Sequence, residues 1–326
     1  MKKKALTFAK LFRIADWWNY LIPPILCFVY IGCLNNTLPF NESIMPCILM
    51  LVSSIITASF GFYINDLFDI KDDALAGKHN QIGLLNKAYR IPLLILLTLL
   101  SIAPWLLTNI DLHIKALLIA QYVFFIGYSA PPFRLKKNKI FALLLDSLYS
   151  GTLFYIIALL VTNNNKYVHP YLVYVLLFCW GFSKGLRNIL LHVILDKEND
   201  EKSDTKTLAT HLPLYKILNF ISYIIIPLEV TFFVLLMWFL LLNSKAALFI
   251  IIGYGCFLLY LLVKPLFLKD KHGLITFYRL NDFYEIVLPG LILLMLAYTI
   301  DYRYLIILAI HYILFPRVLL KLKKAL

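Results

Sequence analysis

Long apolar runs, each about as long as a bilayer is thick, constrain this chain more than any other feature. A helix needs about 20 apolar residues to cross the hydrocarbon core. Because a chain in lipid must satisfy its backbone polar groups internally, each run predicts a membrane-spanning helix. Ten such runs occur, at residues 17–34, 45–66, 91–109, 114–131, 140–162, 169–195, 216–242, 245–268, 283–300 and 304–321.

The charge content agrees with a membrane protein. Charged residues make up 15% of the chain, against about 25% in soluble domains. The net charge of +13 would suggest nucleic acid in a soluble protein, but here the cations lie between apolar runs, so we expect no nucleic acid partner. The five cysteines form no metal-binding pattern. We therefore expect one all-α domain over residues 1–326, a multi-pass bundle of nine to ten helices.

The lysines and arginines predict how the chain is oriented. If ten helices alternate from a cytoplasmic N-terminus, 27 of the 31 cations fall on or near the cytoplasmic side. The exceptions are Lys115, Lys166, Lys245 and Arg303. By the positive-inside rule, both termini are expected in the cytoplasm, with the protein in the cell's inner (cytoplasmic) membrane. The longer loops also fall on this side, where we expect the chemistry.

A first cluster of acidic residues ends the second run. Asp66, Asp69 and Asp73 are spaced i, i+3, i+7, so on a helix they share one face, with Asn65 beside them. Three carboxylates so close repel one another unless a cation is present. Hard oxygen ligands at this spacing suit Mg²⁺, which commonly bridges to substrate phosphates.

A second cluster ends the sixth run. Asp196, Asp200 and Asp204 repeat every four residues and again share one face. The stripe continues backward into the apolar helix, where a polar face must look into the bundle or a wet space because lipid exposure is costly. Its inner members are His192, Asn188 and Lys184.

The two clusters together suggest a ligand. Either one alone could be an ordinary solvated helix end. Both are predicted on the same membrane face, however, where two opposed acidic clusters would hold Mg²⁺ ions between them and bind a diphosphate through those ions.

These residues resemble the UbiA superfamily of intramembrane prenyltransferases. Asn65, Asp66, Asp69 and Asp73 match its N-D-x-x-D-x-x-x-D motif, and Asp196, Asp200, Asp204, Thr207 and Leu208 resemble its second aspartate motif. The stretch 128–136, Tyr-Ser-Ala-Pro-Pro-Phe-Arg-Leu-Lys, is similar to the family's Y-S-x-x-P-x-R-L-K element, and Arg13, Trp18 and Pro23-Pro24 to its first helix. The resemblance covers about residues 8–300. The run at 304–321 departs from it, as a tenth helix or as part of a broken ninth.

The resemblance implies helices around a central cavity and a Mg²⁺-dependent prenyltransferase. A polyprenyl diphosphate would bind with its head between the clusters and its tail in the apolar cavity, and a lipophilic, aromatic acceptor would take the prenyl group. Membrane lipids would be the other partners of the protein. The implied metal ligands are Asn65, Asp69, Asp73, Asp196, Asp200 and Asp204. The implied catalytic residues are Asp66, Asp69, Asp196 and Asp200. Asn65, Tyr128, Ser129, Arg134, Lys136 and Arg13 would contact the substrate, although Arg13 and Lys136 are equally typical of membrane-interface anchors.

Three more polar residues within the runs are candidate substrate contacts. Asp146 is expected to face the cavity, or else to pair with Arg187 or Lys184. Arg187 is a candidate for binding diphosphate or an acceptor carboxylate. His192 is a candidate base or a partner of Asp196, and a plain helix–helix hydrogen bond is the alternative.

Two other functions stay open at this point. A membrane terpene cyclase would use the same metal site without an external acceptor. A transporter would also have charged residues within its helices, but the carboxylates here lie toward one face and not midway through the membrane.

Overall fold

The computed structural model describes residues 8–75, 77–106, 108, 110–162, 170–202, 208–241, 246–263 and 274–317, without the side chains of residues 8, 170, 198–202 and 274–275. In chain order, the first elements are α1 (Phe8–Leu11), α2 (Ile14–Asn35), α3 (Phe40–Leu75), α4 (Gln81–Leu84), α5 (Lys87–Leu106), α6 (Leu112–Ser129), η1 (Leu135–Lys137), α7 (Lys139–Ser147), η2 (Leu148–Thr152) and α8 (Leu153–Val161). The remaining elements are α9 (Pro170–Lys202), α10 (Leu208–His211), α11 (Leu214–Phe220), η3 (Ile221–Ile225), α12 (Ile226–Leu240), α13 (Ala246–Val263), α14 (Leu274–Asp282), η5 (Phe283–Val287), α15 (Leu288–Thr299) and α16 (Tyr304–Leu314).

Each predicted run is helical over most of the part that the structure describes. Eight helical segments are long and apolar enough to cross a membrane, which confirms a multi-pass, all-α membrane protein. Some of them join two helices through a π-helical turn, as η2 joins α7 to α8. The 33-residue α9 is not among the eight, because the polar stripe along it lowers its mean hydropathy.

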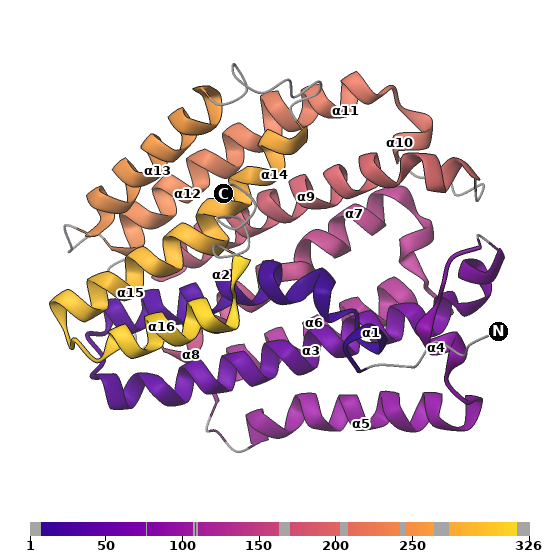
Figure 1. Ribbon diagram of the computed structural model, residues 1–326, viewed down its shortest axis with the longest axis horizontal. Coiled ribbons are helices and arrows are strands. Elements are labelled where there is room, and N and C mark those ends of the chain that lie inside the picture. The colour runs from indigo at the N-terminus through magenta and orange to yellow at the C-terminus, as the bar shows by residue number, and fades with distance from the viewer. Residues whose placement is uncertain are drawn as a thin grey trace.

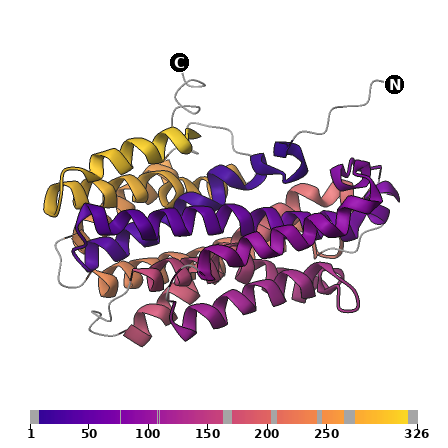
Figure 2. The same ribbon diagram turned by 90° about the horizontal axis from the view of Figure 1, so that it is seen from below.

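The long helices lie side by side along the longest axis of the molecule, as Figure 1 and Figure 2 show. One end carries the C-terminal part of α3, the short helices α4 and α10, and the C-terminal part of α9. The opposite end carries the connection between α15 and α16. The ends of α3 and α9 that bear the two aspartate clusters therefore lie at the same end of the bundle.

Small residues bring α7 and α9 close together. A Cβ at Gly185 would lie 2.8 Å from backbone atoms of Ser147, and one at Gly181 would lie 3.1–3.2 Å from Thr152. This glycine pair, four residues apart, is the small-residue pattern that lets membrane helices approach closely. It sets the part of α9 that carries the polar stripe directly against α7.

The tenth run forms a helix that is shorter than predicted. Its helix α16 ends at Leu314 in place of residue 321, and 318–321 lie outside the described residues. Eleven residues rise only about 16 Å, so α16 covers about half of the hydrocarbon core. It is held by Tyr312, which donates to the Ile286 carbonyl over 2.8 Å, and by His311, hydrogen-bonded to Tyr30 over 3.1 Å.

Adding a methyl group at Gly185 tests the α7–α9 contact. We expect Gly185→Ala to destabilise the protein by about 1–3 kcal/mol, because the new Cβ meets backbone that cannot rotate away. Gly255→Ala on α13 is the matched control, since nothing lies within 4 Å of its Cβ position. Thermal unfolding in detergent measures both. Equal melting temperatures for the two variants would contradict the close contact.

Candidate functional site

Two side chains at the first cluster, Asn65 and Asp69, contact the same cation. The ammonium of Lys136 donates to Asn65 Oδ1 over 2.8 Å and to Asp69 Oδ1 over 2.5 Å. Ser129 also donates to Asn65 Oδ1, over 3.5 Å. Burial lowers the pKa of Lys136, and the Asp69 carboxylate offsets only part of that effect. The amide and carboxylate oxygens of two residues one helical turn apart thus face a single positive charge.

A tight turn after α6 places the side chains of Arg134 and Lys136 next to α3. Arg134 has a left-handed backbone conformation with φ of 40°, and its amide donates to the Ala130 carbonyl over 2.9 Å. Its guanidinium donates to Asp69 Oδ1 over 2.8 Å and lies 2.9 Å from Asp72. The stretch 128–136 therefore contacts the first cluster, as its likeness to the family motif implied.

Arg13 contacts the inner carboxylate of the same cluster. Its guanidinium lies 3.3 Å from Asp66 Oδ1 and 2.7 Å from Asp16 Oδ2. Burial alone lowers the pKa of Arg13, but the charges of Asp66 and Asp16 outweigh that effect and raise it. Arg13 also lies 5.1 Å from the ring centre of Phe62, so it is ordered by α3 and is no free interface anchor.

Asp73, the last member of the cluster, is held by a residue that the sequence analysis did not single out. Asn80 donates to the Asp73 carboxylate and to the Asp66 carbonyl, both over 2.7 Å. Its side-chain oxygen accepts from the Gly83 amide and caps α4. An asparagine just before a short apolar helix was the available signal.

The second cluster is described only at its first member. The Asp196 carboxylate lies 3.5 Å from His192 Nδ1, one turn earlier on α9, and both are substantially exposed. The side chains of Asp200 and Asp204 lie outside the described residues. Among the side chains that are described, no three His, Cys, Asp or Glu residues form a group that could hold a metal.

Asp146 of α7 accepts a hydrogen bond from Tyr149 over 2.8 Å. The Tyr149 ring packs edge-on against Tyr128 with centroids 5.2 Å apart. Tyr128 lies within electrostatic reach of both Asp146 and Asp69, and Asp146 lies within reach of His192. The alternative prediction, that Asp146 pairs with Arg187 or Lys184, is wrong.

Arg187 pairs with a carboxylate of another helix. Its guanidinium makes a two-pronged ion pair with Glu229 of α12 at 2.7 and 2.9 Å, and both side chains are fully buried. Its remaining donors reach the Phe277 carbonyl and Asn281, each over 2.7 Å. These bonds occupy the group that was predicted to bind substrate. A glutamate inside the run 216–242 was the signal for this pairing.

Lys184 and Asn188, on the same helix, also form hydrogen bonds inside the bundle. Lys184 donates to the Tyr155 hydroxyl over 3.2 Å, and Asn188 accepts from Asn281 over 2.9 Å. The inner part of the α9 stripe therefore packs against neighbouring helices. Its outer part, from His192 onward, faces the same end as the first cluster.

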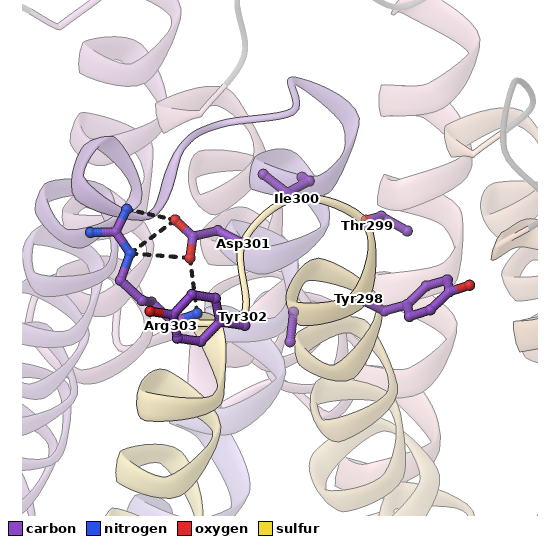
Figure 3. Close-up of a pocket in the computed structure, with 7 residues that line it drawn as sticks. Tyr298, Thr299, Ile300, Asp301, Tyr302 and Arg303 are labelled. Atoms are coloured by element: carbon purple, nitrogen blue, oxygen red, sulfur yellow. Dashed lines mark hydrogen bonds and ion pairs between the residues drawn. The ribbon is translucent and has the colours of Figure 1, made fainter.

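The opposite end of the bundle has a shallow depression of about 600 Å³ at the connection between α15 and α16. Figure 3 shows that the Arg303 guanidinium lies against the Asp301 carboxylate there, to which it donates hydrogen bonds of 2.7–3.1 Å. These residues lie at the protein surface, and their ion pair stabilises the turn between α15 and α16. The depression lies far from both aspartate clusters and is not a candidate for the site.

Comparisons with known proteins agree with this arrangement at the level of the fold. No family model and no curated protein matches the chain. Among solved structures, a UbiA homolog from Archaeoglobus fulgidus bound to DMAPP and Mg²⁺ aligns with a TM-score of 0.60 at 17% identity, over 87% of this chain and 98% of that chain. The chain has the UbiA fold.

Two further structures with the UbiA fold give the same result. The Archaeoglobus fulgidus homolog bound to GPP and Mg²⁺ aligns with a TM-score of 0.59 at 18% identity, over 87% of this chain and 98% of that chain. A digeranylgeranylglyceryl phosphate synthase aligns with a TM-score of 0.60 at 16% identity, over 90% and 97%. Each relative is covered almost completely, so this chain contains the whole UbiA fold together with additional residues.

Removing the charge of Glu229 tests the buried ion pair. We expect Glu229→Gln to cost about 3–5 kcal/mol of stability, because it leaves a buried guanidinium without a counter-charge. Asp301→Asn, which breaks an exposed ion pair, is the control and should change stability little. Thermal unfolding with and without lipid measures both variants. A Glu229→Gln protein as stable as the control would show that the pair is not essential to the interior.

Proposed function

We propose that this protein is a Mg²⁺-dependent prenyltransferase of the UbiA superfamily. It transfers a prenyl group from a polyprenyl diphosphate to a lipophilic, aromatic acceptor within the membrane. The observation that carries the proposal is the convergence of Asn65 and Asp69 oxygens on one cation, at the end of the bundle that also carries the C-terminal part of α9. Relatives with this fold have been solved with DMAPP or GPP together with Mg²⁺.

The donor set fits a hard divalent cation. The Lys136 ammonium already occupies a position between an amide oxygen and a carboxylate oxygen, which are ligands that Mg²⁺ accepts. Asn65, Asp69 and Asp73 from α3 would hold the ion, with Asp196, Asp200 and Asp204 from the second cluster. When bound, Mg²⁺ neutralises charge on the diphosphate as the bond to the prenyl group breaks.

The basic residues of the site then act on the diphosphate. With Mg²⁺ held by Asn65 and Asp69, the Lys136 ammonium would be free to donate to a phosphate oxygen instead. Arg134 contacts Asp69, and Arg13 contacts Asp66 of the same cluster. Their guanidinium groups can therefore bind phosphate oxygens in the same way. Tyr128 and Ser129 flank the cluster and orient the head group.

The orientation of the chain forms part of the proposal. We propose that both termini and the aspartate clusters face the cytoplasm, in the inner membrane, as the distribution of lysine and arginine favours. A cysteine in place of exposed Tyr302 should then react with an impermeant maleimide in intact cells. A cysteine in place of exposed Lys78 should react only after permeabilisation. The reverse labelling pattern would contradict this orientation.

Neutralising Asp69 tests the metal site. With geranyl diphosphate, Mg²⁺ and a total lipid extract as the source of acceptor, we expect Asp69→Asn to lower product formation by about 100-fold or more, because charge stabilisation of the departing diphosphate is lost. EDTA should abolish product formation by the wild type. Asp72→Asn is the matched control: Asp72 lies in the same cluster but is half exposed and outside the motif, so its loss should matter much less.

The same assay separates the alternatives. Mass spectrometry that finds a prenylated lipid supports transfer. A cyclic hydrocarbon and diphosphate formed from geranyl diphosphate without lipid extract would instead identify a terpene cyclase. Failure of the wild-type protein to bind or consume the donor with Mg²⁺ present would contradict both enzymatic functions.

A further inference from the structure

Among the described residues, Asp146 differs from the buried carboxylates in having no cationic partner. The three buried carboxylates in this part of the chain each face an arginine: Asp66 faces Arg13, Glu229 faces Arg187, and Glu285 faces Arg317. Asp146 is partly buried, and the hydrogen bond that it accepts comes from the neutral hydroxyl of Tyr149. A carboxylate in a membrane helix is costly without compensation and is therefore a candidate for function.

The position of Asp146 relates it to both halves of the proposed site. On one side, Tyr149 packs against Tyr128, which precedes Ser129 and its hydrogen bond to Asn65. On the other side lies His192, whose ring nitrogen is 3.5 Å from Asp196. The charged and titratable groups that face Asp146 are thus Tyr149, Tyr128 and His192, from three different elements.

Local structure fixes this position. The close contact of Gly185 with the Ser147 backbone holds α7 against α9 next to Asp146. The π-helical turn η2 begins one residue after Ser147 and contains Tyr149. Such turns often occur at functional sites, and this one includes a kink at Gly151, whose backbone is not helical. Here Tyr149 points back to the Asp146 carboxylate while its ring contacts Phe125 and Tyr128, at 4.7 and 5.2 Å between centroids.

The chemistry of prenyl transfer requires a proton acceptor. The bond from the prenyl carbon to the diphosphate oxygen breaks, and its electron pair leaves with the diphosphate. The acceptor then bonds to the prenyl carbon and must lose a proton. On becoming neutral, Glu229 would leave the buried Arg187 guanidinium without its counter-charge. Asp146 can become neutral without stranding a buried cation.

We propose that the Asp146 carboxylate, oriented by the Tyr149 hydroxyl, receives the proton that the acceptor releases. This inference rests on the proposed function. It assigns the acceptor to the side of the site lined by Asp146, Tyr149 and Tyr128, with the diphosphate on the side of Asn65 and Asp69. Asp146 is then a catalytic residue that acts after the donor has bound.

The variant Asp146→Asn tests this assignment, since the amide keeps the size of the side chain and can still accept from Tyr149. We expect kcat to fall about 100-fold, in the range of a lost general base, while KM for geranyl diphosphate stays within about twofold of the wild type. Thermal stabilisation by Mg²⁺ with the unreactive geranyl thiolodiphosphate should also be unchanged. Asp146→Glu should recover part of kcat, and Tyr149→Phe should lower kcat less than Asp146→Asn does.

Each other outcome has a definite meaning. Asp146→Asn with kcat within about threefold of the wild type overturns the inference and leaves the proposed function standing. Loss of donor stabilisation in Asp146→Asn, with a matching rise in KM, would make Asp146 a donor-binding or structural residue and also overturns it. If wild-type protein shows neither stabilisation by the thiolodiphosphate nor turnover, the proposed function fails, and the proton role fails with it.

Discussion

Pairing of charged side chains inside an apolar bundle is the interaction on which this structure depends. A carboxylate or guanidinium taken out of water is tolerated only when a counter-charge and hydrogen bonds compensate it. Arg187 and Glu229 meet this condition and join α9 to α12, while Arg13 and Asp66 join the start of α2 to α3. Arg317 meets Asp282 and Glu285 just beyond α16 and ties the end of the described chain to η5. In these pairs, the arginines hold neighbouring helices of the bundle together.

A second group of charged side chains lies at the end of the bundle that carries the first acidic cluster. Asn65 and Asp69 share the ammonium of Lys136, and Arg134 bridges Asp69 and Asp72. Such contacts hold the acidic cluster together. In the proposed function these cations would bind the diphosphate, and Asp146, which has no cationic partner among the described residues, would act in a different step.

Much of this could be predicted from the sequence, because the strongest patterns are local. Runs of apolar residues predicted the helices, and i, i+4 spacing placed Asn65 and Asp69 near one another on α3. The return of Lys136 to that cluster followed from the likeness of residues 128–136 to a family motif. The partners of interior charges could not be predicted in this way. Glu229 is 42 residues from Arg187, and only the packing of α9 against α12 decides that it, and not Asp146, is the partner. The length of α16 also depends on tertiary contacts, since Tyr312 and His311 dock a helix too short to span the membrane.

The central claim is that the two acidic clusters bind one metal–diphosphate between them. A structure of the protein in a lipid nanodisc with Mg²⁺ and geranyl thiolodiphosphate tests this most directly. We predict metal density at about 2.0–2.1 Å from oxygens of Asn65, Asp69 and Asp196, with the Lys136 ammonium moved from Asp69 to a phosphate oxygen. A structure in which Lys136 still bridges Asn65 and Asp69, while the diphosphate binds away from Asp196, would contradict the account.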